Sequence, residues 1–359
     1  MTCRKSSPSS RRTTRDWISS SRTIEDDPLS RLDLSRYFLP IAPKLAGVEA
    51  ELQRILQSEV EVVQKLADHV RGGQGKRLRP ALVMLSSRFC GVSNDEDVRF
   101  GAVFELIHTA TLVHDDVIDH AQLRRGMPTL NRLWGNTLTV LFGDLLYLVA
   151  MSESIAGRSW RMMEIFAEVT TRMIEGELIQ NDVLYKLDTS RKDYFDIQER
   201  KTALLFSGCT ETGAVLTGRS LDECRAMREY GLEVGRAFQL VDNLLDYTAT
   251  SEQLGKPAFS DLREGKLTLP MLTLLEKAPD EVRAMIRTIW DRGEEVPIPE
   301  AEEAHLRALI EKHDALVETR ALALKASKNA VANLAAVQGD SATGDLLREI
   351  PEALLSRSK

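Results

Sequence analysis

The chain has 359 residues, of which 43% are hydrophobic and 28% are charged, enough to bury a core without disulfides or metal ions. The net charge of -7 argues against a nucleic-acid-binding protein. Four widely separated cysteines, without any Cys/His cluster, argue against a zinc site and a disulfide framework.

Residues 1–27 differ in composition from the rest of the chain. They combine many Ser and Thr with basic side chains and no long apolar run, and acids return at Glu25, Asp26 and Asp27. This composition predicts an organellar transit peptide, with the mitochondrion as the destination and the plastid as the alternative. A disordered basic extension is the other interpretation of this segment.

The body, residues 28–359, shows the periodicity of helices. Apolar side chains recur at three- and four-residue spacing, for example at Val98, Ala102 and Leu106. Breaks fall near 71–75, 125–128, 255–265 and 293–299. We expect one all-α domain of about ten or more helices. The most apolar stretch, 138–151, is interrupted by Gly143 and Asp144, so we expect no transmembrane span.

Two acidic motifs lie in apolar helical segments. In the first, Asp115, Asp116 and Asp119 end the segment, and the second contains Asp242 and Asp246. Carboxylates at i and i+4 share one helix face and repel each other unless a cation lies between them. Two such motifs facing one another suit Mg²⁺, whereas a solvated helix face is the alternative for either motif alone.

Basic residues accompany the acidic motifs. Each alone fits a surface charge, but together with metal-binding acids they favour the binding of two diphosphates, one through metal ions and one directly. These basic residues are Lys76, Arg77 and Arg79 after the first break, Arg124 and Arg125 after the first motif, and Lys256 and Lys266 after the second.

With these motifs in order, the chain resembles the trans-polyprenyl diphosphate synthase family over about residues 45–350. The matching landmarks are Gly75–Pro80, His108–Asp119, Arg124–Gly126, Gly143-Asp144, Lys201-Thr202, Phe238–Asp246 and Gly265-Lys266. The resemblance implies an all-α isoprenoid-synthase helical bundle with a deep central cavity. It also implies a homodimer, with a heteromer as the alternative, and condensation of isopentenyl diphosphate with an allylic diphosphate.

The resemblance also implies roles for individual residues. About three Mg²⁺ ions are expected to bind with the allylic diphosphate. Their ligands are Asp115, Asp116, Asp119, Asp242 and Asp246, and the first four of these, with Lys201, are the catalytic residues. Isopentenyl diphosphate is assigned to Lys76, Arg79, His108 and Arg125, and the allylic diphosphate to Arg124, Lys201, Lys256 and Lys266, with Thr202 and Gln239 lining the cavity.

One position departs from the family pattern. Asn243 stands where the family usually has a second aspartate. The amide keeps a carbonyl oxygen but loses a charge, so we expect activity to survive with weaker affinity for the metal or the allylic substrate.

Product length is expected to depend on the helix that ends in the first motif. Ala110 and Thr111 lie one turn before Asp115, where short-chain relatives commonly carry a bulky aromatic residue. Phe104 is the next aromatic residue, about 16 Å below Asp115 at roughly 1.5 Å per residue. The resemblance is therefore closest to the long-chain solanesyl- and decaprenyl-type synthases of quinone biosynthesis.

Two alternative functions are retained. A class I terpene cyclase also uses an aspartate-rich motif with Mg²⁺, but its second motif usually differs from residues 242–246. A catalytically silent subunit of a heteromeric synthase is the other alternative, to which Asn243 gives some support. For the synthase we also expect peripheral contact with a membrane during product release.

Overall fold

The computed structural model describes residues 35–73, 75, 77–91, 95–248, 258–294 and 296–356. The predicted leader, Lys76 and Lys256 lie outside these residues, so the domain boundary after residue 27 stays a prediction. Within the described ranges, helices account for nearly all of the regular structure, which confirms the prediction of an all-α fold.

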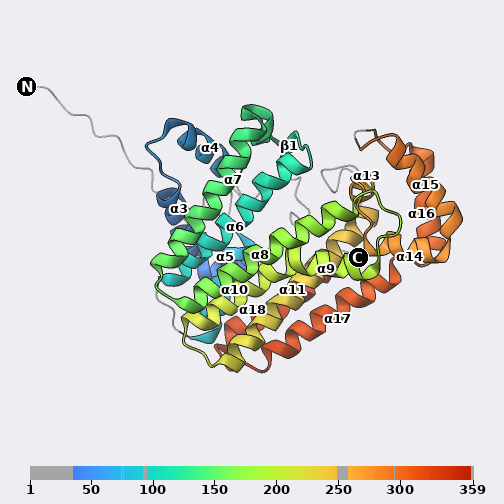
Figure 1. Ribbon diagram of the computed structural model, residues 1–359. Helices are drawn as coiled ribbons and strands as arrows, with labels where there is room; N and C mark the ends of the chain where they lie inside the picture. The colour runs from blue at the N-terminus through green and yellow to red at the C-terminus, as the bar shows by residue number, and fades with distance from the viewer. Residues whose placement is uncertain are drawn as a thin grey trace, which may run out of the picture.

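Long helices form the body of the molecule (Figure 1). Consecutive helices pack as neighbours, α6 against α7 and α10 against α11, and α11 also packs against α17, which lies farther along the chain. The helices of this body are α5 (Leu78–Cys90), α6 (Glu96–Ile118), α7 (Leu130–Ala156), α8 (Trp160–Val183), α10 (Leu204–Leu216), α11 (Leu221–Thr248), α17 (Val317–Leu334) and α18 (Ser341–Ser356).

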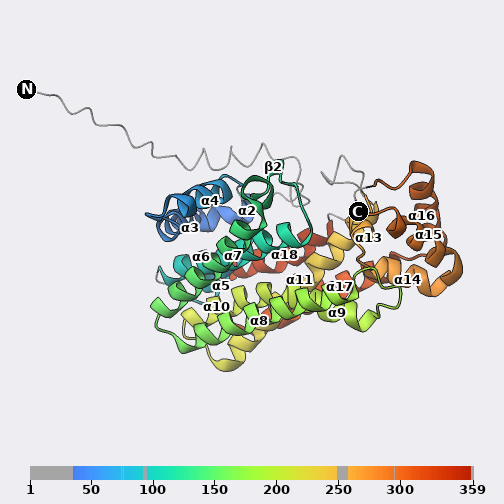
Figure 2. The same ribbon diagram turned by 45° about the horizontal axis from the view of Figure 1, so that its top comes forward.

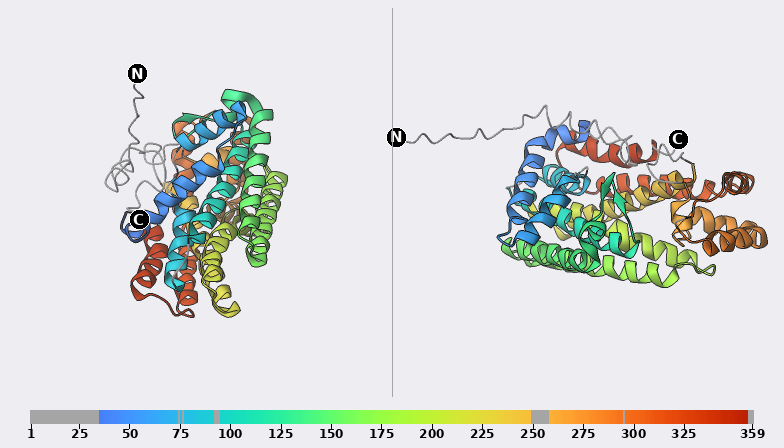
Figure 3. Two further views of the ribbon diagram at one scale, coloured as in Figure 1. Left: turned by 90° about the vertical axis from the view of Figure 1, so that its left-hand side faces the viewer. Right: turned by 90° about the horizontal axis from the view of Figure 1, so that it is seen from above.

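The remaining elements lie around this body. The blue N-terminal helices lie at one end and the orange helices α15 and α16 at the other (Figure 3). The N-terminal elements are α2 (Ser35–Phe38), η2 (Leu39–Ile41), α3 (Ala42–Ile55) and α4 (Glu61–Gly72). The remaining ones are α9 (Arg191–Gln198), η3 (Glu199–Ala203), α13 (Ser260–Arg263), α14 (Leu269–Lys277), α15 (Pro279–Asp291) and α16 (Glu300–Lys312).

Two buried clusters of apolar side chains stabilise the bundle. The larger one joins α3, α5, α6 and α10, with Phe104 and Phe206 among its fully buried members. The second joins α13–α16 to the C-terminal part of α11. Helix α11 contributes Val234 to the first cluster and Val241 to the second. The second acidic motif therefore lies where the two cores meet.

A short hairpin connects α6 to α7. Strands β1 (Leu123–Arg124) and β2 (Met127–Pro128) are antiparallel, with Leu123 opposite Pro128 and Arg124 opposite Met127. The two residues between them, Arg125 and Gly126, have φ of 53° and 73°. Positive φ at both central residues is the requirement of a type I′ turn, which glycine adopts without steric cost. The turn thus holds two adjacent arginines beside the end of α6.

Helix α7 is unusual in its apolar composition. By length and composition alone, it is the one helix in the described part of the chain that qualifies as a membrane span, with 33% of its apolar window buried. It nevertheless packs against α4, α6 and α8 as a member of the bundle (Figure 2). Its position is that of a bundle helix with one apolar face left uncovered.

Candidate active site

The first acidic motif ends α6, as its sequence pattern predicts. Burial raises the pKa of Asp115 to about 6, and the charges of Glu177 and Asp119 also raise it, while Lys201 opposes the change. Asp115 and Asp119 therefore influence each other as expected for carboxylates on one helix face. A desolvated carboxyl with acidic neighbours is a favourable place for a cation.

Asp116 faces a different neighbour. It is buried and accepts a hydrogen bond of 2.6 Å from Nε of Arg124 in the hairpin. Burial raises the pKa of Asp116, although the Arg124 guanidinium lowers it. In this arrangement Asp116 fixes the hairpin to α6, and the predicted roles of both residues in binding metal and allylic diphosphate stay predictions.

Lys266 joins the first motif to the segment beside the second. Its Nζ lies 3.4 Å from a carboxylate oxygen of Asp119 and 2.7 Å from one of Glu264. Burial alone would lower the pKa of Lys266, but Glu264, Asp119 and Asp261 together raise it above its usual value. The ammonium group therefore stays charged between these carboxylates, as the predicted role in diphosphate binding requires.

The three polar positions of the second motif have different surroundings. Asp246 is buried and accepts hydrogen bonds from the hydroxyl of Ser260 at 2.9 Å and from the backbone N–H of Ser260 and Asp261 at 3.2 and 3.4 Å. Asn243 is also buried, and its Oδ1 accepts a hydrogen bond of 2.6 Å from Tyr194. Asp242 is only half-buried, and its charge acts on Arg79. The roles of Asp242 and Asp246 as metal ligands stay predictions.

The acidic residues fit Mg²⁺ only in combination with substrate. Among the described residues, no three carboxylate, imidazole or thiol groups converge closely enough to hold an ion. Mg²⁺ usually takes one or two carboxylates and completes its octahedron with water and substrate phosphates. Carboxylates such as those of Asp115 and Asp242 offer the oxygen donors that this coordination needs. The number of ions and the identity of their ligands stay predictions.

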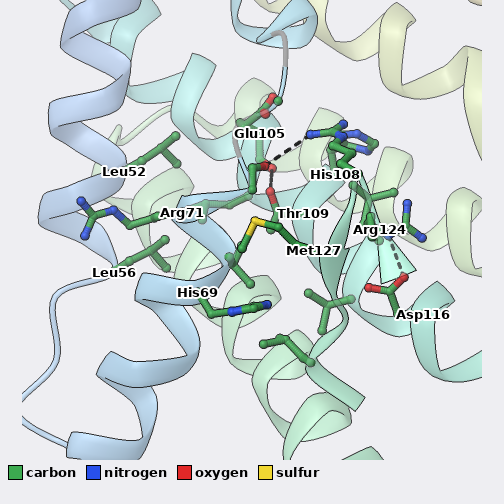
Figure 4. A pocket seen from close by; sticks show the side chains of 18 of the residues that line it. Leu52, Leu56, His69, Arg71, Glu105, His108, Thr109, Asp116, Arg124 and Met127 are labelled. Atoms are coloured by element: carbon green, nitrogen blue, oxygen red, sulfur yellow. Dashed lines mark hydrogen bonds and ion pairs between the residues drawn. The ribbon is translucent and has the colours of Figure 1, made fainter. Parts of the chain in front are cut away.

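Arg79, His108 and Arg125 line one pocket, and their predicted role is to bind a diphosphate there. His108 is labelled in the view of this pocket in Figure 4. Nε of Arg79 is buried and has no hydrogen-bond partner among the residues described. Burial, and then the neighbouring arginines, hold the pKa of His108 well below its usual range. The pocket thus offers guanidinium groups and a neutral imidazole to an anion.

Sequence reasoning missed a carboxylate in this pocket. Glu105 is buried and accepts a hydrogen bond of 2.6 Å from Arg77. Arg77 also pairs with Glu49 of α3. These ion pairs hold the start of α5, which carries Arg79, against α6. In the sequence, Glu105 is an isolated acidic residue in an apolar segment. No neighbouring residue indicates that it pairs with Arg77, which lies 28 positions earlier.

Lys201 and Thr202 belong to η3, a turn of π-helix. Both are predicted to lie at the site of the allylic diphosphate. Nζ of Lys201 lies 2.5 Å from a carboxylate oxygen of Glu177 in α8. The hydroxyl of Thr202 donates to the side-chain oxygen of Gln239 at 2.9 Å. Glu177 was also missed, because its proximity to Lys201 arises only from the packing of α8 against η3.

The residues predicted to control product length lie deeper along α6. Ala110 is fully buried, and Thr111 is half-buried with its hydroxyl donating to the backbone oxygen of His108 at 2.7 Å. The ring of Phe104 packs against α10 at Gly208. The channel past these residues and their effect on product length stay predictions.

Comparison with known proteins identifies the family. The family model described as polyprenyl synthetase matches residues 60–304. This chain belongs to the polyprenyl synthetase family. It is 38% identical to octaprenyl diphosphate synthase of Escherichia coli (strain K12) over 252 residues, which cover 70% of this chain and 78% of that protein.

Solved structures of polyprenyl synthetases have the same fold. A polyprenyl synthase from Caulobacter crescentus CB15, complexed with calcium and isoprenyl diphosphate, is similar with a TM-score of 0.83 and 35% identity, over 91% of this chain and 98% of that one. A decaprenyl diphosphate synthase from Rhodobacter capsulatus gives a TM-score of 0.83 and 34% identity, over 90% and 99%. The isoprenoid-synthase fold predicted from the sequence is therefore confirmed.

Membership of the polyprenyl synthetases also decides between the predicted activities. The chain is a prenyltransferase, of a family that acts on diphosphate substrates and is generally Mg²⁺-dependent. A trans-polyprenyl diphosphate synthase is favoured over a terpene cyclase and over a silent subunit.

Proposed function

We propose that this polyprenyl synthetase condenses isopentenyl diphosphate with an allylic diphosphate to make a long-chain all-trans polyprenyl diphosphate for a quinone side chain. The observation that supports the proposal is the buried carboxyl of Asp115, on which the charges of Lys201 and of the pocket residue Arg124 both act. The buried Ala110 one turn below supports a long product, as do the names of the relatives in Escherichia coli and Rhodobacter capsulatus.

The proposed reaction needs no protein nucleophile. About three Mg²⁺ ions, held by Asp115, Asp119 and Asp242, would supply positive charge that stabilises the departing diphosphate. Lys201 and Lys266 donate hydrogen bonds to the same diphosphate as the allylic C–O bond breaks and the electron pair leaves with oxygen. Arg79, His108 and Arg125 orient isopentenyl diphosphate.

The condensation step then balances without a further reactant. The alkene electron pair of isopentenyl diphosphate forms the new C–C bond to the allylic cation. The released diphosphate takes the proton that restores the double bond. The apolar side chains around Ala110 exclude water, which would otherwise capture the cation.

We also propose that the enzyme is a homodimer that pairs through α7 and α8. Large apolar side chains are exposed along both helices, and an extensive face of this kind in a folded protein marks an interface. The exposed residues are Leu133, Val140, Leu141, Leu148, Met151 and Ile155 on α7, and Trp160, Ile174 and Leu178 on α8. Leu148→Asp is expected to shift the protein to monomer in sedimentation velocity, whereas Leu324→Asp on α17 is not. A wild-type monomer would contradict the homodimer.

The composition of residues 1–27 supports a mitochondrial location, with the plastid as the alternative. Import of the full chain into isolated mitochondria, followed by loss of the leader, is the expected result. The product is long and apolar, which supports transient contact with a membrane surface during release.

Metal removal tests the reaction itself. Purified full-length protein is expected to incorporate labelled isopentenyl diphosphate into an allylic primer with Mg²⁺, to lose this activity in EDTA and to regain it with added Mg²⁺. Consumption of the allylic substrate without isopentenyl diphosphate would indicate a cyclase. Activity that appears only with a second subunit would indicate a heteromer, for which heptaprenyl diphosphate synthase component 2 of Geobacillus stearothermophilus, 35% identical over 310 residues, is a precedent in name.

A further inference from the structure

The turn that carries Lys201 and Thr202 is a π-helix, η3, inserted between α9 and α10. Turns of this kind are rare and are frequently found at functional sites, since the wider turn is less favourable than an α-helical one. Something outside the turn must therefore stabilise it. The contacts of η3 are with α8 on one side and with α11 on the other.

On the α8 side, η3 lies against Gly176. A Cβ atom at Gly176 would lie 2.8 Å from Cβ of Arg200 and 3.0 Å from the backbone nitrogen of Lys201. Because one of these neighbours is a backbone atom, a side chain at position 176 could be accommodated only if the whole π-helical turn moved away from α8. Gly176 lies inside a regular helix without positive φ, where alanine would be favoured by about 1 kcal/mol, so only the close approach requires glycine.

On the α11 side, Gly235 makes the corresponding contact. A Cβ atom there would lie 2.6 Å from Cα of Ala203 and 3.1 Å from its Cβ. The π-turn is thus enclosed between two buried glycines from two helices, an arrangement we name the glycine slot (Gly176 and Gly235).

Polar side chains next to each glycine hold the functional residues of the turn. Glu177 follows Gly176 directly and binds Lys201, with 2.5 Å between Nζ and Oε2. Gln239 lies one turn after Gly235 and accepts the hydrogen bond from Thr202 at 2.9 Å. The flanking residues Arg200 and Glu199 form ion pairs with α8 and α11 respectively. The two glycines determine where the turn lies. Glu177 and Gln239 orient the side chains of Lys201 and Thr202.

We propose that the glycine slot positions Lys201 and Thr202 for the allylic diphosphate alone, and that Gly176 and Gly235 are therefore positioning residues specific for one of the two substrates. The inference rests on the proposed function, because it requires the allylic diphosphate to bind beside Lys201. The pocket of Arg79 and Arg125 belongs to α5 and the hairpin, which do not form the slot.

The test compares Gly176→Ala and Gly235→Ala with Gly213→Ala. Gly213 on α10 is an equally tight packing contact, with 2.5 Å from its built Cβ to Cβ of Ser86, but it lies outside the slot. Calorimetric Kd values are measured for a non-hydrolysable allylic thiodiphosphate and for isopentenyl diphosphate, both with Mg²⁺. We expect the two slot variants to raise the Kd of the allylic analogue about tenfold and the Kd of isopentenyl diphosphate less than about twofold. Gly213→Ala is expected to change neither Kd.

A second variant avoids steric overlap, so that the test does not depend on tolerance of a larger side chain. Ala203→Gly removes the Cβ that lies against the Gly235 side of the slot and loosens the turn. This variant is expected to raise the Kd of the allylic analogue, but by less than the two slot variants do, and to leave the Kd of isopentenyl diphosphate unchanged. Unchanged allylic binding in folded slot variants, or equal weakening of both ligands, would overturn the inference. A wild-type protein that binds neither ligand would overturn the proposed function itself.

Discussion

Tyr194 donates a hydrogen bond of 2.6 Å to the side-chain oxygen of Asn243, and both side chains are buried between α9 and α11. The oxygen that stands in place of the family's carboxylate is therefore engaged inside the protein. Asn243 therefore has a structural contact in this protein, and that contact argues against the predicted weakening of metal affinity.

Asn243→Asp is expected to lower the free energy of unfolding by about 1–3 kcal/mol, because it buries a charge that has little compensation. The apparent Mg²⁺ requirement should not change. Chemical denaturation and a Mg²⁺ titration of activity measure the two effects. Tyr194→Phe is the control, since it removes the hydrogen bond without adding a charge. A tighter Mg²⁺ requirement at unchanged stability would contradict this account.

Asp115→Asn is expected to lower turnover by at least about two orders of magnitude, corresponding to roughly 3 kcal/mol. The metal-free protein should nevertheless become more stable at pH 8. Burial raises the pKa of Asp115 to about 6, so its ionised form disfavours folding above pH 6, and this effect disappears below the unfolded pKa of about 4.

Thermal unfolding in EDTA at pH 8 and at pH 5 checks the sign of this effect. The gain in Tm of Asp115→Asn over wild type should be smaller at pH 5. Near-normal turnover at saturating Mg²⁺ would refute the assignment of Asp115 to the metal site.

Arg79→Lys is expected to raise KM for isopentenyl diphosphate by at least about tenfold while KM for the allylic substrate stays nearly constant. The guanidinium of Arg79 offers a planar set of donors, including a buried Nε without a described partner, that an ammonium group does not reproduce. Steady-state kinetics with each substrate varied in turn measures the separation. An equal rise in both KM values would mean that Arg79 supports the fold and not one diphosphate.

Ala110→Phe is expected to shorten the product, because an aromatic ring one turn below Asp115 would fill the path of the growing chain. Overpacking of a solid core would also cost about 1–3 kcal/mol of stability, whereas a channel accommodates the ring. Chromatography of dephosphorylated products and thermal unfolding separate the two cases. Ala330→Phe, at a buried alanine of α17, should lower stability and leave product length unchanged. An unchanged long product from folded Ala110→Phe would show that Ala110 does not line the channel.

The sequence predicted those features that depend on local periodicity. The i, i+4 spacing of Asp115 and Asp119 requires only an α-helix, and the apolar residues around them identify one. Likewise Arg79, His108 and Arg125 share a pocket, as their motifs indicated. Arg79 lies at the start of α5 and Arg125 in a tight turn, where backbone geometry limits the alternatives, whereas the roles of these residues stay predictions.

The features that were missed depend on packing between distant helices. The π-turn at Lys201 needs Gly176 and Gly235 from two other helices, and neither glycine carries a local signal of that contact. The pairing of Asp116 with Arg124 depends on the geometry of the hairpin, and that of Asn243 with Tyr194 on the approach of α9 to α11. Periodicity specifies helix faces, but it does not specify which helix lies opposite.

The central claim is that this polyprenyl synthetase makes a long-chain polyprenyl diphosphate on its own. Its most direct test is mass spectrometry of the products that the purified full-length protein makes from isopentenyl diphosphate and farnesyl diphosphate with Mg²⁺. The account predicts a dominant linear all-trans diphosphate several isoprene units longer than the primer. A product extended by a single unit, a cyclic hydrocarbon, or no product from the folded protein would contradict it.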